Sequence, residues 1–179
     1  SIQQQMQELN LLGMSQVLET DLTMANKQDW SHDEFLSKLL QSEKSYRDDR
    51  FIEKKIKCAQ FKRNAFLEEF DMSVKRGVTK AVLQELMSLR WLENAKPVVF
   101  VGQTGMGKSY LAEALGRYVC SHRKTVFFKE STELFLMINE GRRLNRYLST
   151  RKRLASFDVL IIDDFGMRKL NSTEAQDLK

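Results

Sequence analysis

The segment Gly102–Ser109, GQTGMGKS, matches the pattern G-x-x-x-x-G-K-[ST] of a phosphate-binding loop. Its glycines let backbone N–H groups turn inward and approach phosphate oxygens, and a helix starting at Lys108 adds its positive N-terminal end. The lysine contributes a compact charge to the β- and γ-phosphates, and the Ser109 hydroxyl ligates Mg²⁺. The alternative is a plain glycine turn between a strand and a helix. We expect ATP and Mg²⁺ to bind here. The residues expected to contact the nucleotide are Gly102, Gln103, Thr104, Gly105, Met106, Gly107, Lys108 and Ser109.

A second motif, VLIIDDF at Val159–Phe165, has the features of a Walker B strand. Its apolar run would place Asp163 at the carboxyl end of a buried strand, where ligands of α/β sheets bind. There Asp163 would hold Mg²⁺ together with Ser109. Asp164 occupies the place where many P-loop ATPases carry a glutamate that activates water, and its side chain is shorter. Two carboxylates that merely end a strand are the alternative. The predicted catalytic residues are thus Lys108, Asp163 and Asp164.

The segment Gly141–Leu154, GRRLNRYLSTRKRL, carries many basic residues and no acidic one. A helix over this segment would gather Arg142, Arg143 and Arg146 on one side, because Arg146 follows the other two by four and three residues. Such a surface can contact the phosphate backbone of DNA, and the alternative is a solvated helix face. The predicted DNA-binding residues are Arg142, Arg143, Arg146, Arg151, Lys152 and Arg153.

A second basic patch lies in residues 41–63, which carry eight basic and four acidic side chains. Its acidic residues Asp48, Asp49 and Glu53 interleave with the basic ones, so pairs within a helix compete with contact to DNA or a partner. The basic residues of this patch are Arg47, Arg50, Lys54, Lys55, Lys57, Lys62 and Arg63.

The elements that would position these residues change in type along the chain. Residues 1–96 read as helical, with a capping box at residues 31–34 (SHDE) and a further helix over Thr79–Arg90. After Pro97, short apolar runs at 98–102, 125–129 and 159–163 predict strands that alternate with helices over Lys108–Ser121 and after Ser131. This alternation is typical of βαβ units in a parallel sheet. The fold class is therefore α/β with a helical region in front.

Composition excludes several other classes. The chain has 179 residues, a net charge of +5 and 42% apolar residues, which excludes disorder as the dominant state. No apolar run approaches the ~18 residues that a membrane span needs. Two distant cysteines, Cys58 and Cys120, and two distant histidines, His32 and His122, support neither a disulfide framework nor a metal cluster. Reduced thiols and a cytoplasmic location are the default expectation.

Taken in order, the motifs resemble the IstB family, AAA+ ATPase helper proteins of insertion-sequence transposons that are related to the helicase loader DnaC. The resemblance rests on LNLLGM at 9–14, LEEFDMS at 67–73, the helix ending in Trp91, GQTGMGKS and VLIIDDFGM at 159–167. It implies an AAA+ P-loop NTPase core over residues 77–179, preceded by an all-α N-terminal domain over residues 1–76.

The resemblance also implies a function. Family members assemble as homo-oligomers on double-stranded DNA when ATP binds, and they recruit or regulate a cognate transposase. In initiator-type relatives the segment between the second and third core strands contacts DNA, and Arg142–Arg153 occupies that place. By the same analogy Phe70 and Asp71 border the adenine pocket, and hydrolysis needs an arginine from a neighbouring subunit.

One departure concerns the sheet. Family cores have the strand order 5-1-4-3-2, with strand 4 between the P-loop strand and the Walker B strand, and this chain ends 16 residues after Asp163. We therefore expect either an incomplete record of a longer protein or a truncated gene product, with unpaired edges on the strands at 98–102 and 159–163. The two halves of the ATP site would then lack the backbone ladder that aligns them.

Other functions are compatible with the same motifs. A helicase loader of the DnaC type differs mainly in its partner. An ATP-gated DNA adaptor with little hydrolysis agrees with aspartate at position 164. A small-molecule kinase leaves the basic segment and the helical region unexplained.

Overall fold

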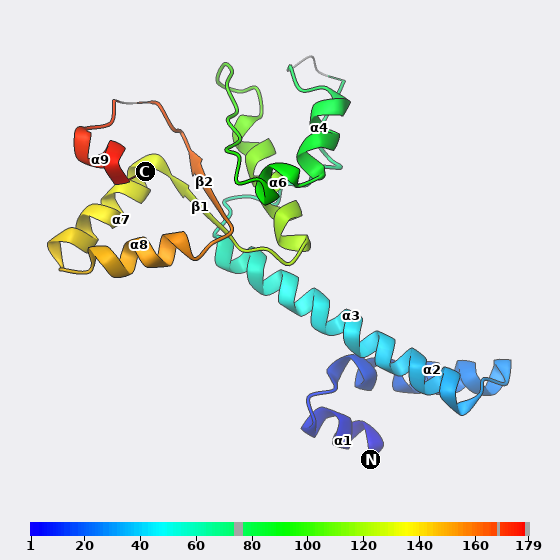
Figure 1. The fold of residues 1–179 in the computed structure, drawn as a ribbon. Coiled ribbons are helices and arrows are strands. Elements are labelled where there is room, and N and C mark those ends of the chain that lie inside the picture. The colour runs from blue at the N-terminus through cyan, green and yellow to red at the C-terminus, as the bar shows by residue number, and fades with distance from the viewer. Residues whose placement is uncertain (74–76, 168, 178–179) are drawn as a thin grey trace. The chain divides into compact units, whose positions relative to one another are not determined.

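A computed structural model describes residues 1–73, 77–167 and 169–177 (Figure 1). The chain forms two compact units, Ser1–Lys54 and Lys55–Lys179, which divide within the long helix α3 (His32–Ala59). The assignment of a helical N-terminal domain that ends at residue 76 stays a prediction.

Three helices build the first unit: α1 (Ile2–Glu8), α2 (Leu12–Gln28) and the greater part of α3. Met14, Leu18 and Leu39 form its buried core. The capping box predicted before α3 is confirmed, because Glu34 accepts hydrogen bonds from the backbone N–H and the hydroxyl of Ser31, while its own N–H donates to the Ser31 hydroxyl.

A buried carboxylate fastens α2 to α3. Oε2 of Glu43 accepts the backbone N–H groups of Gly13, at 2.7 Å, and Met14, at 3.1 Å. A Cβ atom at Gly13 would lie 2.6 Å from Cβ of Tyr46, so only glycine allows this approach. Arg47 completes the arrangement with a 2.7 Å ion pair to Glu43.

The second unit is built around a two-stranded parallel sheet of β1 (Val126–Glu130) and β2 (Val159–Asp163). In its register Val126 pairs with Val159, and Glu130 with Asp163. Before the strands, Thr125 and Asp158 exchange hydrogen bonds, which aligns the two chains as they enter the sheet. The strands predicted at 125–129 and 159–163 are therefore confirmed, the first with a shift of one residue.

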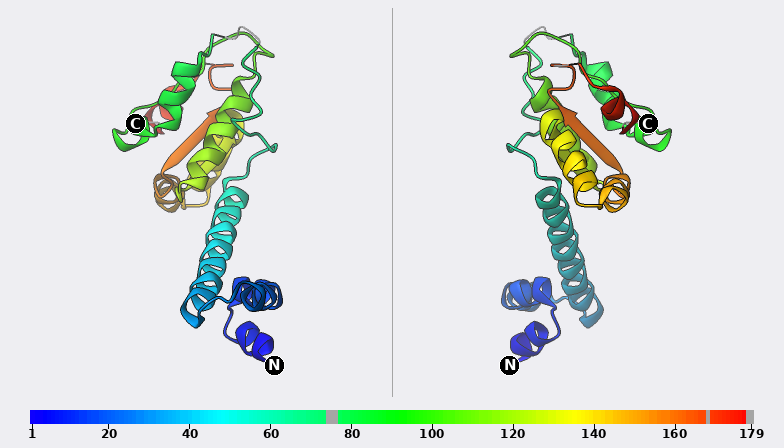
Figure 2. Two further views of the ribbon diagram at one scale, coloured as in Figure 1. Left: turned by 90° about the vertical axis from the view of Figure 1, so that its right-hand side faces the viewer. Right: turned by 90° about the vertical axis from the view of Figure 1, so that its left-hand side faces the viewer.

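Helices cover both faces of this sheet (Figures 1 and 2). Helix α6 (Lys108–Ser121) shares a cluster with Val159 and Ile161 of β2, whereas α7 (Ser131–Arg143) shares another with Leu160 and Ile162. Alternate residues of β2 thus face opposite helices, as a strand buried on both sides requires. Helix α8 (Tyr147–Ala155) leads back from α7 to β2, which completes a βαβ unit.

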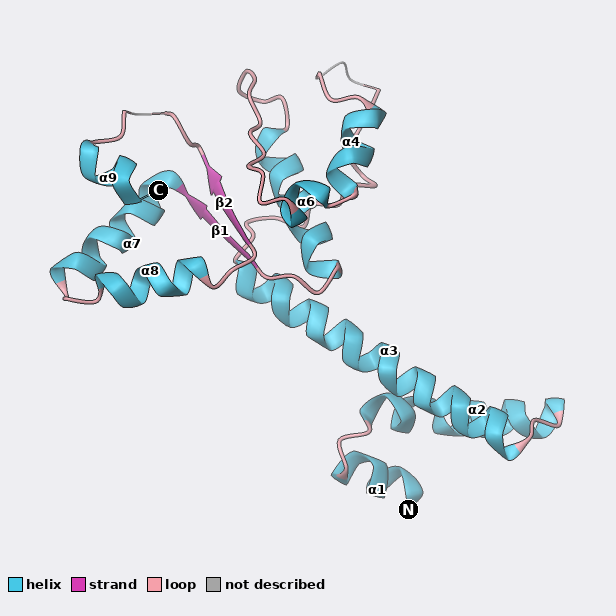
Figure 3. Ribbon diagram, in the orientation of Figure 1, coloured by secondary structure: helices cyan, strands magenta, loops and turns pink. Residues whose placement is uncertain are grey.

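The strand expected at Val98–Gly102 is not formed, which corrects that prediction. The segment runs as a loop (Figure 3) and pairs with neither β1 nor β2 in the described residues. Val98 and Phe100 pack against the cluster around Leu111, while Val99 and Val101 are 75% and 89% exposed. The side chains alternate as in a strand, but a strand also needs a hydrogen-bonded neighbour.

The helix predicted over Thr79–Arg90 is interrupted. It forms α4 (Lys80–Met87), with the Thr79 hydroxyl as its cap, and then α5 (Arg90–Glu93). Leu89 separates them with a left-handed φ of 55°. The described chain closes with the short helix α9 (Ser172–Asp177).

Candidate nucleotide site and basic hairpin

The predicted phosphate-binding loop leads directly into α6. Gly105 and Gly107 both have φ of 82°, a left-handed conformation that disfavours residues with a side chain, and Gly107 caps α6. The ammonium of Lys108 donates a 2.7 Å hydrogen bond to the carbonyl of Gln103. The Lys108 side chain therefore connects the end of the loop, where α6 begins, to the start of the loop at Gln103, and this hydrogen bond stabilises the turned backbone.

The loop and the acidic end of β2 meet through side chains. The Ser109 hydroxyl donates a 2.8 Å hydrogen bond to Oδ1 of Asp163. Helix α6 also packs closely on β2 at Gly116, where a Cβ atom would lie 2.7 Å from Cδ1 of Ile161. As expected, no backbone ladder joins the two halves in the described residues, but the packing of α6 on β2 and the Ser109–Asp163 hydrogen bond hold them together.

The donors at this junction suit Mg²⁺. A hydroxyl and a carboxylate are hard oxygen ligands of the kind that Mg²⁺ takes, with phosphate and water completing its shell. The described residues contain no group of three or more His, Cys, Asp and Glu side chains that could hold a metal alone. Ser109 and Asp163 would hold Mg²⁺ together with a phosphate ligand.

Asp164 follows β2 in a left-handed conformation with φ of 51°. Its backbone carbonyl accepts a 3.1 Å hydrogen bond from the hydroxyl of Ser131, a buried residue. The helix expected after Ser131 begins at Ser131 itself, and Glu130 is its cap. The Ser131 hydroxyl reaches across the sheet edge, a contact that no sequence pattern indicates.

A lysine outside the motifs lies at the same sheet edge. Lys62, in the loop after α3, forms an ion pair with Glu130, the residue in register with Asp163. The hydrogen bond to Glu130 and the nearby charges of Glu130, Glu133 and Asp163 raise the pKa of Lys62, against the opposing effect of burial. Sequence reasoning placed Lys62 in a basic patch and missed this contact.

A cavity of about 270 Å³ lies beside the start of α6 and is lined by Glu69, Phe70, Asp71 and Tyr110. Tyr110 directly follows Ser109, and its ring stacks on Phe70 with 6.3 Å between centroids and 27° between planes. Phe70 and Asp71, expected near an adenine, thus border a cavity next to the phosphate-binding loop.

The basic segment Gly141–Leu154 is a helical hairpin and not one helix, which corrects the expected clustering on one helical side. Helix α7 ends at Arg143, Asn145 has a left-handed φ of 55°, and α8 begins at Tyr147. The two helices approach closely at Gly141. A Cβ atom there would lie 2.7 Å from the Thr150 hydroxyl oxygen.

Arg142 is engaged within the fold. Its guanidinium pairs with the buried carboxylate of Asp177 and lies 4.5 Å from the centre of the Tyr147 ring. The Tyr147 hydroxyl donates a 2.9 Å hydrogen bond to the same Asp177 oxygen. The other predicted DNA-binding residues are exposed, and these are Arg143, Arg146, Arg151, Lys152 and Arg153.

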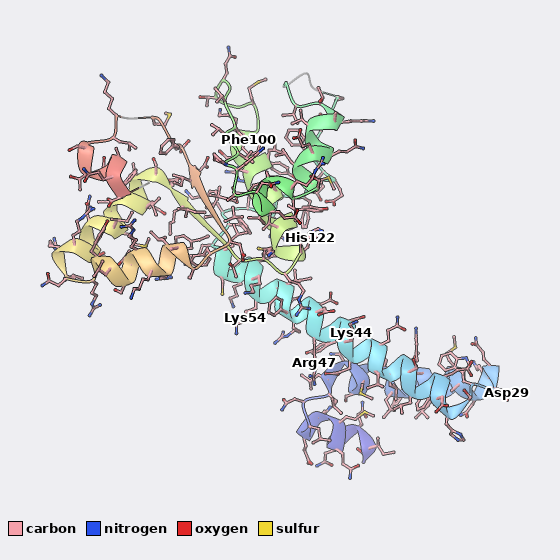
Figure 4. The ribbon with its side chains drawn as sticks, viewed as in Figure 1. Asp29, Lys44, Arg47, Lys54, Phe100 and His122 are labelled. Atoms are coloured by element: carbon pink, nitrogen blue, oxygen red, sulfur yellow. The ribbon has the colours of Figure 1, made fainter. Side chains whose placement is uncertain are left out.

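The second basic patch is also partly used by the fold. Arg47, which follows Lys44 along α3 (Figure 4), pairs with Glu43 in the first unit. In the second unit Arg63 pairs with Glu113, a fully buried carboxylate of α6 that also accepts the backbone N–H groups of Lys62 and Arg63. These pairs make the patch a weaker candidate for DNA contact than the hairpin.

Comparison with known proteins identifies the family. Residues 4–179 match the family described as IstB-like ATP binding protein. An insertion-sequence ATP-binding protein of Sinorhizobium fredii is 29% identical over 95% of this chain and 69% of its own length. The ATP-binding protein of insertion sequence IS1162 from Pseudomonas fluorescens is 31% identical over 97% and 76%. That of IS21 from Pseudomonas aeruginosa is 30% identical over 93% and 63%.

None of the described helices is long and apolar enough to cross a membrane. The family match, the relatives and the mixed helix-rich fold with its parallel sheet agree with part of a P-loop NTPase domain. The chain belongs to the IstB-like ATP-binding proteins of insertion sequences.

Proposed function

We propose that this protein is an ATPase that assembles on double-stranded DNA when it binds ATP, and that it recruits or regulates the transposase of its insertion sequence. The observation that carries the proposal is the hydrogen bond from Ser109 to Asp163, which joins the phosphate-binding loop to the acidic end of β2. The names of its relatives, ATP-binding proteins of insertion sequences, support the biological setting.

Each residue of the site has a role in this proposal. The glycine-rich backbone and the N-terminus of α6 receive the phosphates, and the Lys108 ammonium moves from Gln103 to the β- and γ-phosphates. Ser109 and Asp163 hold Mg²⁺, which neutralises charge on the phosphates. Asp164 orients the attacking water.

The cavity beside Tyr110 is our candidate for the adenine subsite. It lies next to the residue that would hold Mg²⁺, and its Phe70 and Tyr110 rings supply apolar surface for a purine. The exposed basic residues of the α7–α8 hairpin are our candidate DNA surface, since phosphate contacts need free Lys and Arg side chains.

The test is ATP binding followed by hydrolysis, measured by titration with a fluorescent ATP analogue and by phosphate release. Lys108→Ala is expected to abolish binding, whereas Lys27→Ala, an exposed lysine of α2, leaves it unchanged. Undiminished ATP affinity of Lys108→Ala would refute the site.

An ATP-gated DNA adaptor is the second candidate, and Asp164 favours it. Aspartate reaches less far than glutamate toward an attacking water. A single-turnover experiment on DNA separates the two functions, because an adaptor retains uncleaved ATP while an ATPase releases phosphate.

A further inference from the structure

Two leucines are exposed at the closed end of the α7–α8 hairpin. Leu144 is the residue that caps the end of α7, and Leu148 lies in the first turn of α8. Their exposed fractions are 51% and 71%. Leaving two large apolar side chains in water, four residues apart in the sequence where α7 ends and α8 begins, forgoes the stabilisation that burial would give.

The fold does not use these leucines in its core. The cluster between the hairpin and the sheet contains Leu134, Phe135 and Ile138, with Tyr147 and Leu154 packed against it. Neither exposed leucine belongs to this cluster, so the hairpin folds back on the sheet through other residues. Their side chains are therefore available to something outside the unit.

The charges around the two leucines indicate which kind of molecule would bind them. Arg143 and Arg146 flank Leu144, Arg151 and Lys152 follow Leu148 within one turn, and residues 141–157 contain no acidic side chain. All four of these basic residues are exposed. A second copy of this positive surface would be repelled, whereas a polyanion would be attracted. An extended membrane contact needs a broad apolar face, and the turn offers two leucines without an exposed aromatic residue.

We infer that Leu144 and Leu148 form an apolar wedge that enters duplex DNA between stacked base pairs, while the neighbouring basic side chains hold the two backbones. The inference rests on the proposed DNA function and deepens it. Architectural DNA-binding proteins insert leucine and similar side chains at base steps, partly unstack them and kink the duplex. A wedge of this kind favours flexible pyrimidine–purine steps, because these unstack most easily. The ligand class is therefore deformable duplex DNA.

The experiment measures DNA binding and base unstacking by two double variants and one single variant of the full chain, with ATP and Mg²⁺ present. The DNA is a duplex with repeated TA steps that carries 2-aminopurine, whose fluorescence rises when a base unstacks. Leu144→Ser with Leu148→Ser removes the wedge, and Arg143→Gln with Arg146→Gln removes phosphate contacts. Leu136→Ser is the matched control, because Leu136 is a leucine of α7 that is 68% exposed and lies away from the turn.

The leucine pair is expected to lose the fluorescence rise and about tenfold in affinity, with an unchanged dependence of affinity on salt. The arginine pair is expected to flatten the slope of log K against log [salt] by about 1.8. Thermal unfolding of each variant checks that the hairpin still folds.

Two results would overturn the inference while the DNA function stands. In the first, the leucine pair binds and unstacks DNA as Leu136→Ser does, although the arginine pair weakens binding. In the second, the leucine pair changes self-association or binding to phosphatidylserine vesicles but not DNA binding. An unchanged salt slope in the arginine pair would instead refute DNA contact by the hairpin, and with it the proposed function of this surface.

Discussion

The Ser109 hydroxyl lies 2.8 Å from Oδ1 of Asp163 and donates a hydrogen bond to it, although 54 residues separate the two in sequence. Ser109 lies in the first turn of α6, after the glycine-rich loop, and Asp163 is the last residue of β2. A hydroxyl and a carboxylate at this distance can bind the same cation. The bond also shows that α6 and β2 are aligned by their own packing.

Ser109→Ala is expected to weaken Mg²⁺-dependent ATP binding at least about tenfold, because it removes one of the two oxygen ligands that the protein offers. Titration of ATP binding against Mg²⁺ concentration measures the effect. Ser109→Thr keeps a hydroxyl and should bind as the parent does. Ser121→Ala, at the other end of α6, is the matched control, since its hydroxyl bonds to the local carbonyl of Tyr118 and the His122 ring. Equal Mg²⁺ dependence in the Ser109→Ala variant and this control would contradict the assignment.

Ser131→Ala is expected to lower the rate of ATP hydrolysis about tenfold or more while ATP affinity stays the same. The Ser131 hydroxyl holds the carbonyl of Asp164, whose left-handed backbone turns the chain away from β2. Single-turnover kinetics measures the rate, and equilibrium titration measures the affinity. Ser131→Thr keeps the donor and should restore the rate.

The control for the two Ser131 variants is Ser156→Ala. Ser156 is an exposed residue before β2, and its hydroxyl donates to the backbone carbonyl of Arg153. A parallel loss of rate and affinity in Ser131→Ala would indicate general damage to the fold and contradict a positioning role.

Gly116→Ala is expected to lower the free energy of unfolding by about 1–3 kcal/mol, because the added methyl group would overlap its neighbours. Its Cβ atom would lie 2.7 Å from Cδ1 of Ile161 and 2.8 Å from the Phe61 ring. Alanine favours a helix over glycine by about 1 kcal/mol, so a rise in stability would show that α6 does not pack this closely. Chemical denaturation measures the change. Ile161→Val removes the Cδ1 atom and should recover part of the loss.

Local patterns predicted the elements that their own residues determine. The glycine pattern predicted the loop before α6, and the apolar run at 159–163 predicted β2 with the correct bounds. The capping box at Ser31 predicted the start of α3, because both of its partners lie within one turn.

Features that depend on distant partners could not be predicted in this way. Val98–Gly102 has the composition of a strand, but a strand forms only beside a neighbour, and the described chain brings none to it. In the sequence Arg142 cannot be distinguished from its basic neighbours, because its partner Asp177 is 35 residues away. The Ser131 contact also depends on two segments 33 residues apart.

Arg142→Ala and Arg143→Ala should separate the structural from the DNA-binding side chains of the hairpin. Arg142→Ala leaves the buried Asp177 carboxylate without its cation and should lower the free energy of unfolding by about 1–3 kcal/mol. Arg143→Ala removes an exposed cation, so stability should hold while DNA affinity falls. Thermal unfolding and DNA titration in parallel distinguish them. The reverse pattern would mean that Arg142, and not Arg143, faces the phosphates.

Stability of the first unit should depend on pH through Glu43. Burial raises the pKa of Glu43, but the hydrogen bond from Arg47 and those from the N–H groups of Met14 and Gly13 outweigh it, so the pKa lies below its ordinary value. A lowered folded-state pKa gives stability that is fully present above the ordinary glutamate pKa of about 4.3 and is lost as pH falls through the folded-state value.

Glu43→Gln should therefore lower stability at neutral pH and flatten its acid dependence. Helical circular dichroism during urea unfolding, at pH values from about 3 to 7, provides the measurement. Glu8→Gln, on exposed α1, is the control, and an equal acid dependence in Glu43→Gln and this control would contradict the role of Glu43.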